Sequence, residues 1–330
     1  MSKANATVVK YKLRKHPDAD TLSIADIEGS AWQVVVRTAD FLQEGTAIYI
    51  PVDTIVAEAP EFEFLREKHF RIKAIKLRGE YSYGLLIPNK ENIPIGEDVT
   101  GKLGIIKYEP PIPIEMSGES VLSSEVDWIC VYTDIERHEN FPNVFKDKEE
   151  VMVTEKIHGS NLRVSRNGEN LFVGGHKWMW KESERNLYWK AIRQNNFDKI
   201  LLERLPDKIV LFGEVYGKKV QKLQYGLDTQ KIVFYDAFKD GKYFNWDEFI
   251  ELMNQIGLSS SIVPVIYRGE YDLDVIKTLS RGNTLLSGGH IREGVVVKPV
   301  TERVDGKLGR VILKFINPMY EISKERTDFH

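Results

Sequence analysis

Hydrophobic and polar residues alternate in short runs along the first third of the chain. These runs are rich in Val, Ile, Tyr and Phe, and Gly, Pro, Asn or Asp separates them. A period of two residues is typical of β-strands with one buried face. The pattern predicts strands over residues 6–13, 21–27, 32–38, 46–52, 69–77 and 83–88.

About six strands in so short a segment fit a small barrel such as an OB-fold. The pattern stops at residues 107–125, where Pro110, Pro111 and Pro113 precede small polar residues. This composition is typical of a linker that is first stiff and then flexible. We therefore expect two domains, residues 1–120 and 121–330, which the length of 330 residues accommodates.

The second part of the chain mixes two periods of hydrophobic residues. Helical spacing covers residues 184–205 and 246–258. Strand-like runs cover residues 150–175, 208–217, 230–238, 288–299 and 309–317. Interspersed strands and helices of this kind predict an α+β domain.

Composition narrows the class of protein. Contents of 42% hydrophobic and 29% charged residues are typical of globular proteins. No apolar run approaches the roughly 20 residues that span a bilayer, and Met1-Ser2-Lys3 leads into no secretory signal, so we expect no membrane partner. The single cysteine, Cys130, excludes an internal disulfide and a cysteine-rich zinc site. It suits the cytoplasm or another reducing compartment.

The charges nearly balance, with 46 Lys and Arg against 49 Asp and Glu and a net charge of −3. A chain of this kind does not coat nucleic acid as a polycation, so contact with RNA or DNA would require a local face. One candidate is a run of basic residues near the C-terminus, for which a solvated turn is an equal alternative. The run comprises Lys298, Arg303, Lys307, Arg310 and Lys314.

Several predicted strands of the second part carry residues that suit nucleotidyl transfer. Lys156, in the sequence EKIHGSN, leaves a strand directly into a turn that contains Gly159. Glu214 lies at a strand end, and Glu293 and Lys314 lie in the last two strand-like runs. One nucleophilic amine, two carboxylates and further lysines are what covalent nucleotidyl transfer from ATP requires.

The chemistry explains each of these residue types. A lysine attacks phosphorus only as the neutral amine, although its usual pKa is about 10.4. Burial and nearby positive charge lower that pKa, and a divalent metal ion held by Glu214 and Glu293 would supply the charge. Lys298 and Lys314 would neutralise phosphate oxygens in the transition state. Gly159 would let the backbone approach the nucleotide without a Cβ.

In this order the segments resemble the motifs of the covalent nucleotidyltransferase superfamily, and EKIHGSN resembles the form found in ATP-dependent RNA ligases. The resemblance spans Arg137–Asn317. It implies an N-terminal all-β OB-fold barrel followed by a C-terminal α+β nucleotidyltransferase domain, an ATP-grasp-like ligase domain with antiparallel sheets. It also implies ATP and Mg²⁺ or Mn²⁺ as cofactors.

The resemblance further implies roles for individual residues. Lys156 would become the lysyl-AMP, Arg137 would orient the leaving pyrophosphate, and Tyr235 or Phe234 would stack on adenine opposite Val296. The family's aromatic–Asp pair matches Tyr235-Asp236, which favours Tyr235. Glu214 and Glu293 would hold the metal, mostly through water. The catalytic residues would be Lys156, His158, Glu293, Lys298 and Lys314. The nucleotide-binding residues would be Arg137, Glu155, Asn161, Lys177, Glu214, Phe234, Tyr235 and Val296.

Two positions depart from the family pattern. The sequence GGHKWMW stands where the family often has an Arg, so His176 or Lys177 would replace it. Ile316 stands where some relatives carry a second lysine, so Lys298 or Arg310 would take that role.

The first domain resembles the OB-type tRNA-binding module of some aminoacyl-tRNA synthetases, in the stretches KHPDADTLSIADIEGSAWQVVV and FRIKAIKLRGEYSYGLLIP. Its candidate RNA contacts are Lys73, Lys76, Arg78 and Tyr83, through phosphate neutralisation and stacking. A solvated barrel face is an equal alternative for each of them. We expect His16 to pin a turn rather than to bind a metal.

An OB module ahead of the transferase domain resembles the clade of RNA ligases that seal 3′-OH/5′-phosphate nicks in duplexes. We therefore predict an ATP-dependent RNA ligase, monomeric, whose partner is RNA in the form of a nicked duplex with a 3′-OH ribonucleotide end. The alternatives are a capping guanylyltransferase, a DNA ligase and a non-catalytic OB-type RNA-binding protein. Intact Lys156, Glu214, Glu293 and Lys314 argue against the last.

Overall fold

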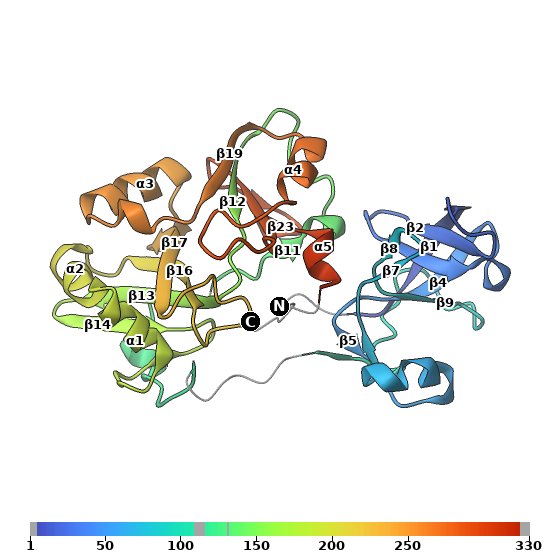
Figure 1. Ribbon diagram of the computed structural model, residues 1–330, viewed down its shortest axis with the longest axis horizontal. Coiled ribbons are helices and arrows are strands. Elements are labelled where there is room, and N and C mark those ends of the chain that lie inside the picture. Colours follow the sequence, from blue (N-terminus) through green and yellow to red (C-terminus); the bar gives the residue numbers. More distant parts are fainter. Residues whose placement is uncertain (1–4, 109–115, 131, 324–330) are drawn as a thin grey trace. The chain divides into compact units, whose positions relative to one another are not determined.

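The computed structural model describes residues 5–108, 116–130 and 132–323 (Figure 1). The chain divides into two compact units, one of Met1–Glu109 with Glu136–Pro142 and one of Pro110–Ile135 with Asn143–His330. Pro110, Pro111 and Pro113 of the expected linker lie outside the described residues, as does the N-terminal Met1-Ser2-Lys3. The segment Glu136–Pro142, which follows the boundary expected near residue 120, groups with the first unit.

The first unit is built from short antiparallel strands. Its main sheet has the order β3-β2-β1-β4-β9, a second sheet has the order β10-β5-β6, and β7 and β8 form a hairpin. The strands are β1 (Thr7–Lys15), β2 (Leu22–Ile27), β3 (Gln33–Arg37), β4 (Glu44–Ile50), β5 (Thr54–Ile55), β6 (Arg71–Ile72), β7 (Ile75–Leu77), β8 (Glu80–Ser82), β9 (Leu85–Pro88), β10 (Ile106–Lys107) and β11 (Glu136–Arg137).

Alternation along these strands fills two apolar cores. Val8 and Ile50 belong to one core, and Tyr11 and Leu13 belong to the other. The single strand expected over residues 69–77 is wrong. His69 and Phe70 have positive φ angles of 51° and 56°, which are incompatible with an extended strand, so β6 starts only at Arg71.

The second unit contains a six-stranded antiparallel sheet of order β15-β14-β13-β16-β17-β18, beside a sheet in which β23, β20, β12 and β19 are neighbours. The strands are β12 (Glu150–Glu155), β13 (Ser160–Asn167), β14 (Asn170–Gly174), β15 (Met179–Trp180), β16 (Val210–Gly217), β17 (Gln230–Lys239), β18 (Lys242–Tyr243), β19 (Val265–Glu270), β20 (Gly294–Pro299), β21 (Val304–Asp305), β22 (Gly309–Arg310) and β23 (Leu313–Ile316).

The helices of the second unit cover its sheets (Figure 1). They are α1 (Leu187–Gln194), α2 (Phe197–Arg204), α3 (Trp246–Gln255), α4 (Leu273–Leu279) and α5 (Pro318–Glu321). Helical spacing over residues 184–205 predicts one helix, but two are present, because Asn196 has a φ of 56° and interrupts the helical backbone. No helix among the described residues has the length and apolar character needed to cross a membrane.

Candidate active site

Lys156 follows the last residue of β12 and begins the turn into β13. Its backbone amide donates to the Gly294 carbonyl over 3.0 Å, which fixes the turn against the start of β20. A Cβ on Gly159 would lie 2.3 Å from the Val215 carbonyl oxygen and 2.6 Å from Cγ of Glu214. The glycine therefore allows the turn to pack closely on β16. The sequence suggests a different reason for a glycine here, namely close approach of the backbone to a nucleotide.

The Lys156 side chain ends in a group of interacting polar residues. Its ammonium lies 2.6 Å from Oε1 of Glu293, and Oε2 of the same carboxylate lies 3.3 Å from Nδ1 of His158. The Tyr320 hydroxyl lies 2.8 Å from that nitrogen. Burial alone would raise the pKa of Glu293, but Lys156 and His158 outweigh it and lower the pKa to about 2. Glu293 is therefore ionised beside Lys156.

Glu214 is the second carboxyl group of this site. It lies on β16 directly opposite Asn161 of β13. Burial raises its pKa to about 8, because the attraction of Lys156 only partly offsets burial and the charge of Glu293 opposes ionisation. At neutral pH the two carboxyl groups thus differ in charge. We refer to Lys156, His158, Glu214, Glu293 and Tyr320 as the Lys156 cluster.

A pocket opens beside Lys156, and cross-strand pairing explains which residues of one sheet line it. Thr154 of β12, Val296 of β20 and Lys314 of β23 are directly opposite one another and so share one face of their sheet, from which Thr154 and Val296 line the pocket. Lys298, two residues after Val296, lies on the same face. The pocket is lined by Tyr132, Ile135, Thr154, Glu155, Lys156, Ile157, Glu214, Tyr235, Asp236, Trp246, Val263, Val296, Lys298 and Ile312.

A β-bulge brings two neighbouring residues of β17 into this pocket. Phe212 pairs with Asp236 and Gly213 pairs with Phe234, so Tyr235 is the extra residue. Successive residues of a regular strand face opposite sides, but a bulge redirects one of them. Tyr235 and Asp236 therefore both line the pocket, whereas Phe234 is fully buried against Phe197 in the core. Of the two aromatic candidates, only Tyr235 reaches the site.

Asp236 joins Lys298 in a buried network of charges. Its carboxylate binds the Lys298 ammonium, the Tyr132 hydroxyl and, over 3.0 Å, Nη1 of Arg310. Glu302 accepts from Arg310 over 2.6 Å and lies 3.4 Å from the Lys298 ammonium. Burial alone would raise the pKa of Asp236, but Arg310 and Lys298 outweigh it and lower the pKa. We call Tyr132, Asp236, Lys298, Glu302 and Arg310 the Asp236 network.

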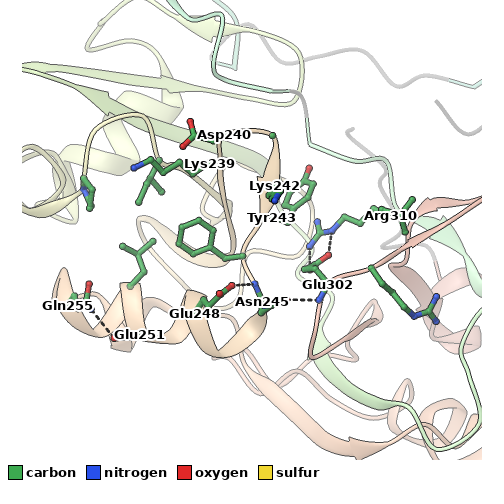
Figure 2. Close-up of a pocket in the computed structure, with 17 residues that line it drawn as sticks. Lys239, Asp240, Lys242, Tyr243, Asn245, Glu248, Glu251, Gln255, Glu302 and Arg310 are labelled. Carbon is green, nitrogen blue, oxygen red and sulfur yellow. Dashed lines mark hydrogen bonds and ion pairs between the residues drawn. The ribbon is translucent and has the colours of Figure 1, made fainter.

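The Asp236 network also reaches a second, wider groove of about 930 Å³ (Figure 2). Arg310 and Glu302 line this groove, and the Arg310 guanidinium stacks over the Tyr243 ring at 3.6 Å. The side of the groove near α3 is formed by Asn245 and Glu248, which cap the helix reciprocally. Four acidic and four basic side chains are among the residues that line the groove, which therefore favours no single sign of ligand charge.

The remaining predicted residues lie in different surroundings. Glu155 accepts from Leu285 N over 2.7 Å, and Asn161 donates to the Tyr235 hydroxyl over 2.7 Å. Arg137 groups with the first unit, where it lies 3.2 Å from Glu139 and 4.7 Å from the Trp32 ring centroid. Lys177 is exposed in the loop between β14 and β15, where His176 lies 3.4 Å from Asp134. Their roles stay predictions.

Sequence reasoning missed several residues of the site. Tyr320 contacts the predicted His158, Asp236 binds the predicted Lys298, and Tyr132 binds Asp236. The aromatic–Asp pair at Tyr235-Asp236 was the only sequence signal among them. In the first unit, His16 accepts from Asp18 N and contacts the Leu77 carbonyl, so the prediction that it pins a turn is confirmed.

Comparison with protein families gives two matches. A family model described as RNA ligase matches residues 149–316, and an OB-fold domain model matches residues 6–89. Two curated relatives are β subunits of phenylalanine–tRNA ligase, from Trichormus variabilis and Ralstonia nicotianae, each 30% identical to this chain. Each match covers 31% of this chain. The matches cover only 14% of the Trichormus variabilis protein and 12% of the Ralstonia nicotianae protein.

Solved structures resemble the chain over nearly its whole length. A lysine-to-alanine variant of the Naegleria gruberi RNA ligase with ATP and Mn has a TM-score of 0.79 and 27% identity, covering 96% of this chain and 98% of that one. The same ligase with PPi has a TM-score of 0.78 and 25% identity, with the same coverage. The predicted OB-fold and α+β architecture is confirmed. The chain belongs to the RNA ligase family, within the covalent nucleotidyltransferase superfamily, and carries an OB-fold domain ahead of its ligase domain.

Proposed function

We propose that this protein is an ATP-dependent RNA ligase that works through a lysyl-AMP intermediate. The observation that carries the proposal is the Lys156 ammonium, which lies 2.6 Å from Glu293 and lines a pocket together with Tyr235, Val296 and Lys298. Similarity to a ligase seen with ATP and Mn and with PPi supports ATP and a divalent metal as cofactors.

The proposed reaction has three steps. Lys156 attacks the α-phosphorus of ATP, a P–N bond forms, and pyrophosphate leaves. An RNA 5′-phosphate oxygen then attacks the lysyl-AMP, which transfers AMP to the RNA and frees Lys156. Finally the 3′-OH attacks the activated 5′-phosphate, and AMP leaves as the phosphodiester forms. In each step a phosphoryl group moves between nucleophiles that are held in line, so positioning provides most of the catalysis.

The residues present fit a metal ion that is mostly hydrated. Within the described residues, no group of three or more His, Cys, Asp or Glu could hold a metal. Glu214 and Glu293 instead offer two carboxyl groups. Asn161 lies opposite Glu214, and its buried Oδ1 atom has no hydrogen-bond partner among the described residues. Oxygen donors that are few in number suit Mg²⁺ or Mn²⁺ with several waters retained. When bound, the metal would polarise the α-phosphate.

The domain roles belong to the same proposal. The OB-fold domain, residues 1–120, would contact RNA, and residues 121–330 would carry out adenylation. Lys76 lies 5.1 Å from the centroid of the Tyr81 ring, which in turn stacks on Tyr83 at 6.0 Å. A cation beside stacked aromatic rings is a common arrangement for binding nucleotides. The substrate we propose is a nicked duplex with a 3′-OH ribonucleotide end, sealed by a monomer.

The decisive experiment is labelling with α-labelled ATP. We expect the wild-type protein to form an acid-stable protein–AMP adduct and Lys156→Ala to form none, since the attacking amine is absent. Lys199→Ala, which removes an exposed lysine on α2, serves as the matched control and should label normally. An undiminished adduct in Lys156→Ala would refute the proposal. Labelling by GTP instead would indicate a capping enzyme, and sealing of a 3′-deoxy end would indicate a DNA ligase.

A further inference from the structure

A loop between β16 and β17, residues 218–229, is fastened to the turn that carries Lys156. The Gln221 side-chain amide donates to the Gly159 carbonyl, and the Tyr225 hydroxyl accepts from the His158 amide over 2.7 Å. Val220 and Leu223 of the loop are buried in the large apolar core of the second unit. The loop therefore contacts two of the three residues that follow Lys156, through side chains that no catalytic role requires.

The loop has a fixed conformation. Its ends are joined by a hydrogen bond from Lys218 N to the Thr229 carbonyl over 3.3 Å and from the Gln230 side chain to the Lys218 carbonyl over 2.6 Å. Lys219 and Tyr225 have positive φ angles of 62° and 56°. Such backbone strain costs on the order of 1 kcal/mol per residue and persists where the surroundings hold it.

Three lysines project from this fixed loop while its apolar residues face inward. Lys218, Lys219 and Lys222 are exposed, between and beside the buried Val220, Gln221 and Leu223. Lys218 lies 3.9 Å from Asp228, but both side chains are exposed, so this ion pair contributes little. The loop thus presents three positive charges to solvent next to the Lys156 turn.

The basic run that the sequence suggested as a nucleic-acid face is different. Lys298 binds Asp236, Arg303 binds Glu149 and Arg310 binds Glu302. These cations already have carboxylate partners that are buried or nearly so, and a phosphate would have to compete with them. In the 218–229 loop, by contrast, Asp228 pairs with Lys218 in solvent, where such a pair competes only weakly with phosphate.

We propose that the 218–229 loop binds the RNA backbone, with Lys218, Lys219 and Lys222 neutralising phosphates next to the end that is joined. This inference rests on the proposed function and adds a phosphate-binding surface to it. Gln221 and Tyr225 hold the loop to the Lys156 turn, so that RNA bound by the lysines lies beside the nucleophile. Because lysines contact phosphate as point charges, the loop binds RNA without regard to its sequence.

The test replaces all three lysines with alanine and measures binding of a nicked RNA duplex over a range of salt concentrations. Each phosphate that the protein no longer neutralises reduces the slope of log K against log salt by about 0.9. We expect the slope of the variant to fall by about 2 to 3 and its affinity at low salt to fall at least tenfold. Circular dichroism and thermal unfolding check that the variant folds.

The matched control removes the same charge elsewhere in the unit. Lys190, Lys199 and Lys277 are exposed on α1, α2 and α4, and their replacement with alanine should change the slope by less than about 1. An unchanged slope in the loop variant, or an equal fall in the control, overturns the inference. The proposed function is judged separately, by the protein–AMP adduct of the wild-type protein, so the two failures are distinguishable.

Discussion

The Lys156 cluster and the Asp236 network each contribute residues to the same pocket and each combine a lysine and a tyrosine with two carboxyl groups, but their charges are arranged differently. In the network, two cations face two carboxylates, and Lys298 is 5% exposed. In the cluster, Lys156 is 18% exposed and faces one ionised carboxylate, while Glu214 keeps its proton at neutral pH. The network balances its charges without a ligand, whereas the cluster contains a neutral carboxyl group that can still ionise.

The difference shows that two lysines lining the same pocket can have different roles. Lys298 is held by two carboxylates, so its first contribution is to position Asp236 and the bulged segment around Tyr235. Lys156 lies beside the ionised Glu293 and lines the pocket. Under the proposed function, a metal ion held by Glu214 and Glu293 would offset their negative charge and favour the neutral Lys156 amine. Lys298, in a balanced buried network, helps to build the site, whereas Lys156, beside a carboxyl group that can still ionise, is the residue to which the proposed function assigns the nucleophilic attack.

The largest effect we expect comes from breaking the network. Asp236→Asn keeps the shape of the side chain but leaves Lys298 and Arg310 buried with less opposing charge. Removing one member of a buried ion pair costs about 3–5 kcal/mol of unfolding free energy. Asp247→Asn is the control, since Asp247 also pairs with an arginine, Arg268, but is 63% exposed and should cost at most about 1 kcal/mol.

Urea unfolding of the two variants measures this difference. Equal losses of stability in Asp236→Asn and Asp247→Asn would show that the network is not the structural element described above.

The second prediction concerns the pH dependence of stability at Glu214. Its pKa is about 8 in the folded protein and about 4.3 in an unfolded chain, so the folded state binds the proton more tightly. Stability therefore falls as pH rises from about 4.3 to about 8, at up to roughly 1.4 kcal/mol per pH unit. Glu214→Gln removes this dependence, and we expect wild type to lose about 2–4 kcal/mol more than the variant between pH 5 and 8.

Glu293 provides the comparison for this experiment, with the opposite sign. Its pKa of about 2 lies below that of an unfolded chain, so its stabilising contribution is complete above about pH 4.3 and is lost only as pH falls toward 2. Glu293→Gln removes no titration of its own between pH 5 and 8, but it removes a charge that opposes ionisation of Glu214. We therefore expect the pH dependence to persist in this variant with a smaller amplitude than in wild type, whereas Glu214→Gln removes it. Metal-free urea unfolding at four pH values distinguishes the two carboxyl groups.

Sequence alone predicts the order of the elements and the identity of the Lys156 cluster better than the Asp236 network. Lys156, His158 and Glu293 belong to motifs with recognisable spacing, and the structure brings them together. The pairing of Asp236 with Lys298 depends instead on the bulge in β17 and on the register of β20, neither of which a linear pattern specifies. The break between α1 and α2 was missed for a similar reason, because a hydrophobic period says nothing of one positive φ at Asn196.

The third prediction tests how closely the Lys156 turn is packed. Gly159→Ala would place a Cβ against the Val215 carbonyl and the Glu214 side chain, both of which must shift. Overpacking of this kind costs about 1–3 kcal/mol, and the displaced turn should also slow adenylation. Gly306→Ala, where a Cβ meets nothing within 4 Å, is the control. Thermal unfolding and the rate of protein–AMP formation should change in the first variant only.

The smallest effect we expect lies at the edge of the Lys156 cluster. Tyr320→Phe removes the hydroxyl that lies 2.8 Å from Nδ1 of His158, while the ring keeps its edge contact with the imidazole at 5.6 Å. Removing a hydrogen bond costs about 1 kcal/mol of stability, and His158 then keeps Glu293 as a partner at 3.3 Å. Because Nδ1 no longer divides its interactions between two oxygens, the imidazole should reorient toward Glu293, and the pH profile of sealing should shift.

Tyr271→Phe is the control for this prediction. Tyr271 lies just after the end of β19 and beside Phe145, and the substitution removes a hydroxyl of the same kind but should leave the pH profile in place. An unshifted profile in Tyr320→Phe, with stability lowered as expected, would make Tyr320 a packing residue and limit the cluster to its other four residues.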